Sequence, residues 1–445
     1  MYRFPDGLYS DIRIEDSVSA YYSVENGEVK NNSEIAVTGA MIRVYDGKMW
    51  YTSVTNSLDE IQNELDNLAS LAEPNDKIAD DPVIKNLEVH KLSVIKYDGD
   101  NDLRKITRAQ REELVNGYIA SCVDGSPEEV KSWSISYSQG HDIKKFYSSK
   151  GAEIEQDYQS ARLSAVYMIS VDGVTTPAYK PFVEMDFDSL KGHEKEIIDE
   201  RGRFLDYAKN AVPVEPRDYV CVLAPMVTAM FTHESFGHKS EADFMLNDET
   251  LRKEWEMGKK VGSDLVSICD SGDMPNHGYV PYDDEGTKVK PTWLITNGIL
   301  TGRLHDAKSA AALGEELTGN SRAQDYSCTP IVRMTNTYMS GGDRTPEDII
   351  SEIKDGMYVY QVNYGTGSST FTMQPSLCYR IRDGKLCEPV RANVVTGSVF
   401  KTLFDIDALG NDFELFNSYT CGKGGQFVPV SAGGPTIRVK SLTVN

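Results

Sequence analysis

Two histidines that bracket a glutamate form the segment whose residue types and spacing stand out most for chemistry. The segment is MFTHESFGH, residues 230–238, and it contains two of the chain's 7 histidines, His233 and His238. Imidazole nitrogens are ligands for zinc and for other transition metals. At this composition only about 0.01 chance matches to His-Glu-x-x-x-His are expected. The pattern therefore predicts a metal site that includes these two side chains.

The spacing of the two histidines constrains the backbone between them. Pro225 stands at a favourable first helical position, and apolar residues follow it at helical spacing. On a regular α-helix, residues five positions apart point about 140° away from each other and cannot reach one ion. One extra residue in the turn, a π-bulge, restores the convergence. Because Gly237 lets the backbone relax, we expect a bulge or kink at Ser235–Gly237; the alternative is a straight helix with two unrelated histidines.

A catalytic zinc needs a third protein ligand. Two local candidates, Glu241 and Asp243, follow His238 by three and five positions. A distant candidate is Cys421 in the sequence YTCGKGGQ, residues 419–426. Glycines after the cysteine let the backbone approach closely, and a thiolate binds zinc well, although such a cysteine taken alone is more often a buried, inert thiol. The residues by themselves leave the third ligand open.

Two polar segments are weaker candidates. The acidic run Asp283, Asp284 and Glu285 could line a cleft or orient a metal ligand. In a chain of net charge −22, however, an acidic run is more often a solvated loop. The segment Arg333–Thr337 is interpreted as a polar strand or turn.

Isolated histidines are weaker candidates as well. His277 and His305 could donate hydrogen bonds to an oxyanion or to a metal ligand, but a lone histidine is more often structural. His193 and Glu194 repeat the His-Glu pair without a second histidine within two helical turns. We interpret that pair as a solvated surface feature.

Composition excludes several classes of function. The chain has 445 residues with 46 Lys+Arg against 68 Asp+Glu, which counts against binding to nucleic acid or to an anionic membrane. No apolar run reaches the roughly 18–20 residues that span a bilayer, and the first residues do not resemble a signal peptide. The sequence contains no GxxxxGK[ST], no GxGxxG after a strand and no GxSxG. Nucleotide-binding and serine-hydrolase interpretations therefore fail.

The cysteines indicate a reducing environment. There are 7 of them, widely spaced and without a CxxC pair. An odd, scattered set is typical of thiols that remain reduced, so we expect a cytoplasmic protein.

Strand signals dominate the first half of the chain. Asn26-Gly27 and Asp46-Gly47 are turn sequences with the residues that β-hairpins need. They predict hairpins of segments 19–25 with 28–38 and of segments 39–45 with 48–55. Further strands are expected at 131–148 and 152–171.

Helix signals alternate with these strands. Capping boxes at Ser57-x-x-Glu60 and Thr107-x-x-Gln110 predict helix starts, and the first helix is expected to end near residue 72. Residues 188–210 have the pattern of a charged amphipathic helix.

The second half of the chain differs in character. Prolines at 213, 216 and 225 surround a short apolar strand, 218–224, so we place a domain boundary near residue 212. After the histidine motif come many short β signals, Gly-rich turns and a helix that begins at Thr345-Pro346. The predicted fold is α+β, with an N-terminal mixed α/β domain at 1–212. A largely antiparallel, curved-sheet C-terminal domain at 213–445 would carry the metal-binding helix.

Several segments together resemble one family. HESFGHKSEAD, residues 233–243, is similar to the metal-binding helix of the TldD branch of the TldD/PmbA proteins. Residues 283–286, 318–320, 333–337 and 421–436 resemble the same family, and the match extends from about 217 to 439, with a looser fit before it. The resemblance implies that His233, His238 and Cys421 bind zinc and that Glu234 is the catalytic base. Lys239-Ser240 departs from the family, which usually has Gly and an apolar residue there.

The resemblance also implies a function. It predicts a zinc peptidase of unfolded or short peptides that holds an extended substrate by strand-like backbone contacts in an enclosed cleft. It predicts a homodimer, or a heterodimer with a homologous subunit, without direct contact to nucleic acid or membrane. One alternative is a non-catalytic zinc or scaffold subunit, which should have a closed four-ligand site. Another is an indirect modulator of DNA gyrase, a label attached to this family.

Overall fold

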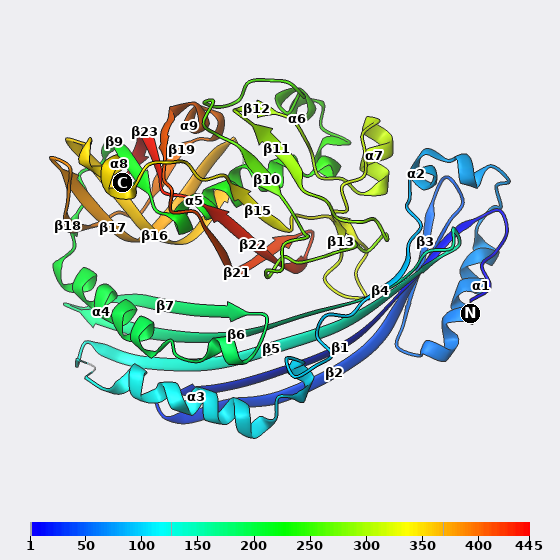
Figure 1. Ribbon diagram of the computed structural model, residues 1–445, viewed down its shortest axis with the longest axis horizontal. Helices are drawn as coiled ribbons and strands as arrows, with labels where there is room; N and C mark the ends of the chain where they lie inside the picture. The colour runs from blue at the N-terminus through cyan, green and yellow to red at the C-terminus, as the bar shows by residue number, and fades with distance from the viewer. Residues whose placement is uncertain (1, 126, 368) are drawn as a thin grey trace.

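A long, curved β-sheet extends under the whole molecule (Figure 1) in the computed structural model, which describes residues 2–125, 127–367 and 369–445. The strand order is β3-β2-β1-β5-β6-β4, and β7 also pairs with β6. The pairs are antiparallel except that of β4 with β6. The strands are β1 (Tyr9–Glu25), β2 (Glu28–Tyr45), β3 (Trp50–Thr55), β4 (Lys91–Val94), β5 (Val130–Ser148), β6 (Glu153–Val171) and β7 (Val174–Glu184).

The predicted turns are present, but one predicted strand end is wrong. Asn26 and Gly27 have φ values of 49° and 85°, as the turn between β1 and β2 requires. Segments 28–38 and 39–45 are a single strand, β2, in which Gly39 stays paired with Glu15. A Cβ on Gly39 would lie 2.2 Å from the Tyr326 ring. This glycine therefore permits a close contact with the C-terminal half and does not end a strand.

Helices cover one face of this sheet. They are α1 (Ile61–Leu71), α3 (Arg108–Val123) and α4 (Glu194–Asn210), with the short α2 (Pro82–Lys85) at the edge. Their apolar faces pack on alternate residues of the strands, so that Ile12 of β1 lies in the core with Leu65 of α1. The neighbouring Arg13 points to the opposite face, where its guanidinium bonds carbonyl oxygens of the C-terminal half.

One of the two predicted capping boxes forms. At the start of α3, the Thr107 hydroxyl accepts from the Gln110 N–H, and the Gln110 side chain accepts from the Thr107 N–H. At Ser57 the prediction is wrong. The Ser57 side chain makes no cap bond, and Leu58–Glu60 form a separate 3₁₀ turn before α1. The Glu60 carboxylate bonds forward to the amide of Asn63 and so does not reach back to Ser57.

The C-terminal half contains two larger sheets. One has the order β12-β11-β10-β15-β22-β21, and the other has the order β16-β9-β23-β19-β17-β18-β8, with β20 against β23. The first consists of β10 (Ile268–Asp270), β11 (Thr292–Thr296), β12 (Ile299–Leu300), β15 (Asn336–Met339), β21 (Glu414–Lys423) and β22 (Gln426–Gly434). The second consists of β8 (Val212–Pro213), β9 (Arg217–Leu223), β16 (Asp355–Gly367), β17 (Thr370–Arg382), β18 (Lys385–Arg391), β19 (Val395–Ser398), β20 (Ile406–Leu409) and β23 (Ile437–Val444).

Helix α5 (Pro225–Thr232) lies between these two sheets, against β22, β15 and β16. Its side chains Val227 and Phe231 belong to the largest apolar core of the molecule. The remaining elements are α6 (Glu249–Glu254), α7 (Ala307–Leu313), α8 (Pro346–Ser351), α9 (Val399–Asp405), β13 (Ser321–Arg322) and β14 (Ile331–Val332). The α+β fold class is confirmed. The boundary at residue 212 stays a prediction.

Within the described ranges, no helix is both long enough and apolar enough to pass through a membrane.

Replacing Thr107 by Ala should lower the free energy of unfolding by about 1 kcal/mol, because the hydroxyl that accepts from the Gln110 N–H is lost. Urea denaturation followed by circular dichroism measures this change. Ser57→Ala is the matched control, and its effect should stay within about 0.5 kcal/mol because Ser57 forms no cap. Equal losses in both variants would contradict this assignment of the caps.

Candidate metal centre

The helix that carries the two histidines contains the expected extra residue. After α5, residues His233–Gly237 form a π-helical turn in which the His238 N–H bonds the His233 carbonyl, five residues back. The predicted bulge at Ser235–Gly237 is confirmed. The wider turn places both imidazoles on one side of the helix, with ring centroids 5.2 Å apart.

Gly237 makes room for this turn. A Cβ at this position would lie 1.9 Å from the Met334 sulfur, so a larger residue requires the core to move. The glycine therefore allows the π turn to pack directly on the segment that precedes β15.

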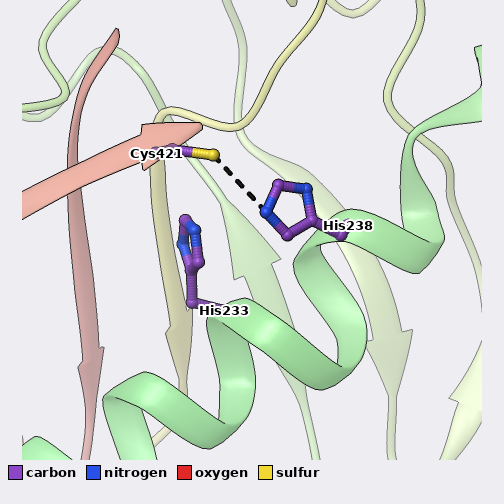
Figure 2. A group of neighbouring side chains, drawn as sticks. All are labelled: His233, His238 and Cys421. Atoms are coloured by element: carbon purple, nitrogen blue, oxygen red, sulfur yellow. Dashed lines mark hydrogen bonds between the residues drawn. The ribbon is translucent and has the colours of Figure 1, made fainter. Parts of the chain in front are cut away.

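Cys421 reaches the histidines from strand β21. Its sulfur lies 3.5 Å from Nε2 of His238, and one donor atom from each of His233, His238 and Cys421 lies within 4.8 Å of the others (Figure 2). His233 and Cys421 are only 3% and 2% exposed. Two imidazoles and a thiol from distant parts of the chain thus enclose a space of the size that one ion occupies.

Hydrogen bonds between these groups shift their protonation. Burial raises the pKa of the Cys421 thiol, but hydrogen bonds and charge from His233 and His238 outweigh it and lower the pKa to about 5. Burial lowers the pKa of His238, whereas hydrogen bonds to Cys421 and Glu241 raise it to about 10. The sulfur is therefore a thiolate at neutral pH, which is the form that binds metals, whereas the His238 ring gives up a proton when a metal binds. Two nitrogens and a thiolate fit a transition-metal ion.

Glu234 lies beside the donors without joining them. Its side chain is half-buried, and burial raises its pKa above the ordinary value although His233 and His238 oppose the shift. Strand β16 closes over it through two glycines. A Cβ on Gly365 would lie 3.5 Å from Cγ of Glu234, and a Cβ on Gly367 would lie 2.6 Å from its carbonyl oxygen. The backbone and Cγ of Glu234 thus lie against the end of β16.

Comparison with known proteins decides the family. The model of the PmbA/TldA metallopeptidase C-terminal domain matches residues 216–445, and that of metallopeptidase domain 1 matches residues 10–73. The chain belongs to the PmbA/TldA metallopeptidase family. It is similar to a metalloprotease of Synechocystis, with 29% identity over 98% of this chain and 94% of the relative. It is also similar to a zinc metalloprotease TldD homolog of Saccharolobus solfataricus, with 30% identity over 98% of this chain and 96% of the relative.

Solved structures share the fold. TldE from Thermococcus kodakarensis superposes with a TM-score of 0.75 at 18% identity, over 98% of this chain and 96% of that one. A Thermotoga maritima protein named as a modulator of a DNA gyrase has a TM-score of 0.78 at 18% identity, over 99% of this chain and 96% of that one. The chain is therefore a metallopeptidase by family, and its fold is that of these two proteins.

In this metallopeptidase, the two local candidates for the third ligand lie elsewhere. Glu241 accepts from the opposite ring nitrogen of His238, Nδ1, at 2.9 Å, and it is fully buried. Asp243 is paired with Lys423 at 2.8 Å. A carboxylate on the far nitrogen of an imidazole fixes the ring's tautomer and orientation. In the sequence, the position of Glu241 three residues after His238 indicated that it lies near the site. This spacing did not distinguish a metal ligand from a residue that orients a ligand.

Arg333 supports the strand of the metallopeptidase that carries Cys421. Its side chain is fully buried and donates to the Cys421 carbonyl oxygen at 2.5 Å and to the Gln426 carbonyl oxygen at 3.3 Å. Thr335 and Thr337, two positions apart, both donate to the buried carboxylate of Asp270. The segment 333–337 therefore holds the sheet beside the metal centre, and its arginine could not be assigned this role from sequence.

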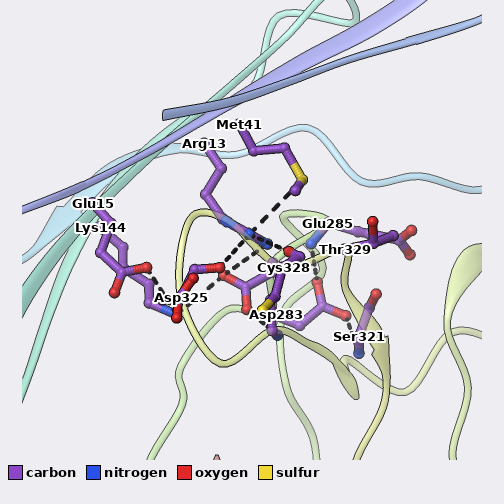
Figure 3. Close-up of polar contacts among 12 residues, drawn as sticks. Arg13, Glu15, Met41, Lys144, Asp283, Glu285, Ser321, Asp325, Cys328 and Thr329 are labelled. Atoms are coloured by element: carbon purple, nitrogen blue, oxygen red, sulfur yellow. Dashed lines mark hydrogen bonds and ion pairs between the residues drawn. The ribbon is translucent and has the colours of Figure 1, made fainter. Parts of the chain in front are cut away.

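The acidic run is not a solvated loop, so that interpretation is wrong. Asp283, Asp284 and Glu285 are only 3%, 8% and 8% exposed. They lie where the N-terminal sheet meets the C-terminal half, and Figure 3 shows Asp283 and Glu285 there. Asp284 pairs with Lys144 at 3.3 Å and with Arg13 at 3.8 Å. Burial raises its pKa, but the two cations outweigh burial and leave the pKa below the ordinary value. This cluster joins the two halves of the molecule and contributes no donor to the metal centre.

The isolated histidines also lie outside the centre. Nδ1 of His277 is 2.8 Å from the Tyr158 hydroxyl, and burial, with nearby arginines, lowers the His277 pKa to about 3. His305 bonds Ser309 and Glu315. His193 is not simply solvated: it bonds Glu196 and stacks on Phe182 at a centroid distance of 4.1 Å.

Replacing Gly237 by Ala should lower metal content strongly, because the new methyl group collides with Met334 and displaces the π turn that positions the histidines. Elemental analysis of the purified chain measures the content. As the matched control, Met334→Ala is made both in the wild-type chain and in the Gly237→Ala chain. If the collision is the cause, Gly237→Ala should cost much less in the chain that lacks the methionine side chain. The same loss in both backgrounds would contradict this cause.

Proposed function

We propose that this metallopeptidase is a zinc-dependent hydrolase of unfolded or short peptides. His233, His238 and Cys421 are its zinc ligands, and Glu234 is its general base. The observation that carries the proposal is the convergence of two imidazoles and a thiolate within 4.8 Å of one another, with a carboxylate beside them. Three protein ligands leave one position open, which is the pattern of catalytic zinc sites.

Donor chemistry favours zinc over harder cations. A thiolate with a pKa near 5 and two imidazoles match the ligand preference of zinc, although cobalt or nickel also bind such a set. The relative from Saccharolobus solfataricus carries zinc in its name. When bound, zinc supplies a Lewis acid that polarises a peptide carbonyl and makes water more acidic.

Glu234 performs the proton transfers in this proposal. Its carboxylate takes a proton from the attacking water and passes it to the amine that leaves. Burial raises the pKa of Glu234, and a carboxylate with a raised pKa is a stronger base than one in open water. Glu234 interacts electrostatically with His233, His238 and Cys421, which agrees with a position beside the donors.

The strand that carries Cys421 provides a surface for an extended peptide. β21 is the last strand of its sheet, and in the described part of the chain no strand pairs with its other edge. A peptide that pairs with this edge brings its backbone past the cysteine. Recognition of backbone groups gives weak sequence preference. It also requires an unfolded or short substrate, because folded chains already pair their backbones.

The start of β21 lies beside a cavity. The cavity measures about 370 Å³ and lies between β7, α4, the start of α5 and residues 414–418. Asn417 donates to the Val183 carbonyl oxygen and so holds β21 to β7 at this place. We expect the part of the substrate distant from the cleaved bond to extend into this space.

We propose that the chain acts as a homodimer, or as a heterodimer with a homologous subunit, in the cytoplasm. The 7 cysteines, widely spaced and without a CxxC pair, support a reducing compartment. The net charge of −22 supports the proposal that the chain contacts neither nucleic acid nor membrane directly.

The two alternatives have less support. A non-catalytic zinc or scaffold subunit should enclose its ion with four protein ligands, whereas the cluster found in the described residues has three. A gyrase-modulator name belongs to a structural relative at 18% identity, and that likeness extends to the fold alone.

Glu234→Gln should retain zinc, but its rate of peptide cleavage should fall at least about a hundredfold, because the amide cannot take the proton of the attacking water. Cleavage of an unfolded protein or a labelled oligopeptide, measured with zinc content on the same sample, tests this. The matched control is Glu194→Gln, which changes the other His-Glu pair of the chain and should keep full activity. A Glu234→Gln chain that cleaves at the wild-type rate would end the assignment.

We expect about one zinc per chain in the wild type. Cys421→Ala should lose most of this zinc, because only two imidazoles remain as ligands. Elemental analysis on protein prepared without chelators measures this. Cys378→Ala, at a buried thiol away from the donors, is the control and should keep its zinc. Unchanged zinc in Cys421→Ala would remove this residue from the ligand set.

A further inference from the structure

Lys423 is a largely buried cation two residues after Cys421 on strand β21. Its side chain is 9% exposed. Its ammonium donates to both carboxylate oxygens of Asp243 at 2.8 Å and to the Val332 carbonyl oxygen at 2.8 Å. It also lies 3.2 Å from Oε2 of Glu241. Because a buried charge is costly unless it is paired, this lysine is held in a single place by its partners.

One oxygen of Glu241 joins this lysine to a ligand. The same Oε2 that lies beside Lys423 accepts from Nδ1 of His238 at 2.9 Å. Glu241 is fully buried, so its carboxylate is held in one place by these two contacts. Its position sets the direction in which Nε2 of His238 points.

Lys423 and Glu241 connect the two segments of the chain that supply the donors. His238, Glu241 and Asp243 follow the π turn, whereas Cys421 and Lys423 belong to β21, about 180 positions along the chain. Even without an ion, Lys423 joins β21 to the histidine segment, because its ammonium contacts the carboxylates of Glu241 and Asp243. Arg333, which follows the Val332 carbonyl that accepts from Lys423, holds the Cys421 carbonyl oxygen from the other side.

We propose that Lys423 is a positioning residue of the metal centre. Through Glu241 it orients the His238 ring, and through Asp243 it keeps the histidine segment at the right distance from Cys421. The donors are then in place before an ion binds, so that less order has to be created on binding. This inference rests on the ligand set of the proposed function and adds a residue that touches neither the ion nor the substrate.

Zinc affinity of the metal-free chain tests the proposal. The dissociation constant is measured by competition with a chromophoric chelator. Lys423→Met should weaken zinc binding about 10–100-fold, the range typical for loss of a group that orients a ligand. Glu241→Gln should do the same. If Lys423 acts through Glu241, the double variant should bind no more weakly than the worse single variant, so that the two effects are not additive.

A matched control separates positioning from loss of stability. Lys144→Met also removes a lysine held by buried carboxylates, Asp284 and Glu15, but at the junction of the two halves. It should lower the melting temperature and leave the zinc dissociation constant within about twofold of the wild type. The cobalt-substituted chains give a second measure, because absorption from the thiolate–cobalt bond should change in Lys423→Met and not in Lys144→Met.

Several outcomes would overturn the inference. A folded Lys423→Met chain with wild-type zinc affinity would do so, and so would fully additive losses with Glu241→Gln. If Lys423→Met does not fold, Asp243→Asn decides, because it loosens Lys423 without touching a ligand and should weaken zinc severalfold; unchanged affinity would end the proposal. Peptide cleavage is not the readout. Chains that show the expected affinities but cleave no peptide would refute only the proposed function.

Discussion

Side chains five residues apart on an α-helix diverge by about 140°, and any site that needs both of them must first change the helix. Here the change is the bond from the His238 N–H to the His233 carbonyl, which widens one turn and brings two imidazoles to within 5.2 Å between centroids. The turn is stable only where the surroundings accept it. The absence of a side chain on Gly237 lets Met334 pack against the widened turn. This turn places the two imidazoles on the side of the helix that faces Cys421.

The C-terminal sheets complete what the turn begins. Helix α5 lies between them, so one sheet presents Cys421 to the histidines while β16 of the other closes over Glu234. A buried thiol would ordinarily remain protonated, but the two imidazoles lower the Cys421 pKa to about 5. The same burial raises the Glu234 pKa. Burial of both groups therefore accompanies a thiolate at Cys421 and a raised pKa at Glu234, because the charged neighbours of the two groups differ.

The N-terminal sheet contributes from outside the centre. Its Arg13 donates to the carbonyl oxygens of Asp325 and Cys328, at 2.8 and 2.7 Å, and so anchors the loop between β13 and β14. Gln426, at the turn after Cys421, donates to the Thr329 carbonyl oxygen of the same loop. The buried acidic run lies at this junction (Figure 3). Asp284 is paired with Lys144 and Arg13, whereas burial raises the pKa values of Asp283 and Glu285, so fewer charges have to be paired between the two halves.

Local rules predicted the local features of this protein from its sequence. The spacing of His233 and His238 required a bulge, Asn26-Gly27 required a hairpin, and Thr107 required a cap; each is present because it depends on residues within a few positions of one another. One local rule failed for a local reason, because Glu60 bonds Asn63 and does not complete the cap at Ser57. The other failures occurred where a distant segment intervened. Gly39 accommodates Tyr326 and does not end a strand, and Asp283–Glu285 are buried by the opposite half of the chain.

The choice of the third candidate donor was divided between sequence and tertiary structure in the same way. The residues around His238 left Glu241, Asp243 and Cys421 equal in principle, and only the family resemblance favoured the cysteine. Tertiary structure placed the sulfur of Cys421 at the histidines, turned Glu241 to the far nitrogen of His238, and paired Asp243 with Lys423. Sequence by itself determined which donor types were available and how the helix had to bend. Which of them meet was decided by the packing of β21 against α5, because contacts between residues so far apart depend on the core that both elements bury.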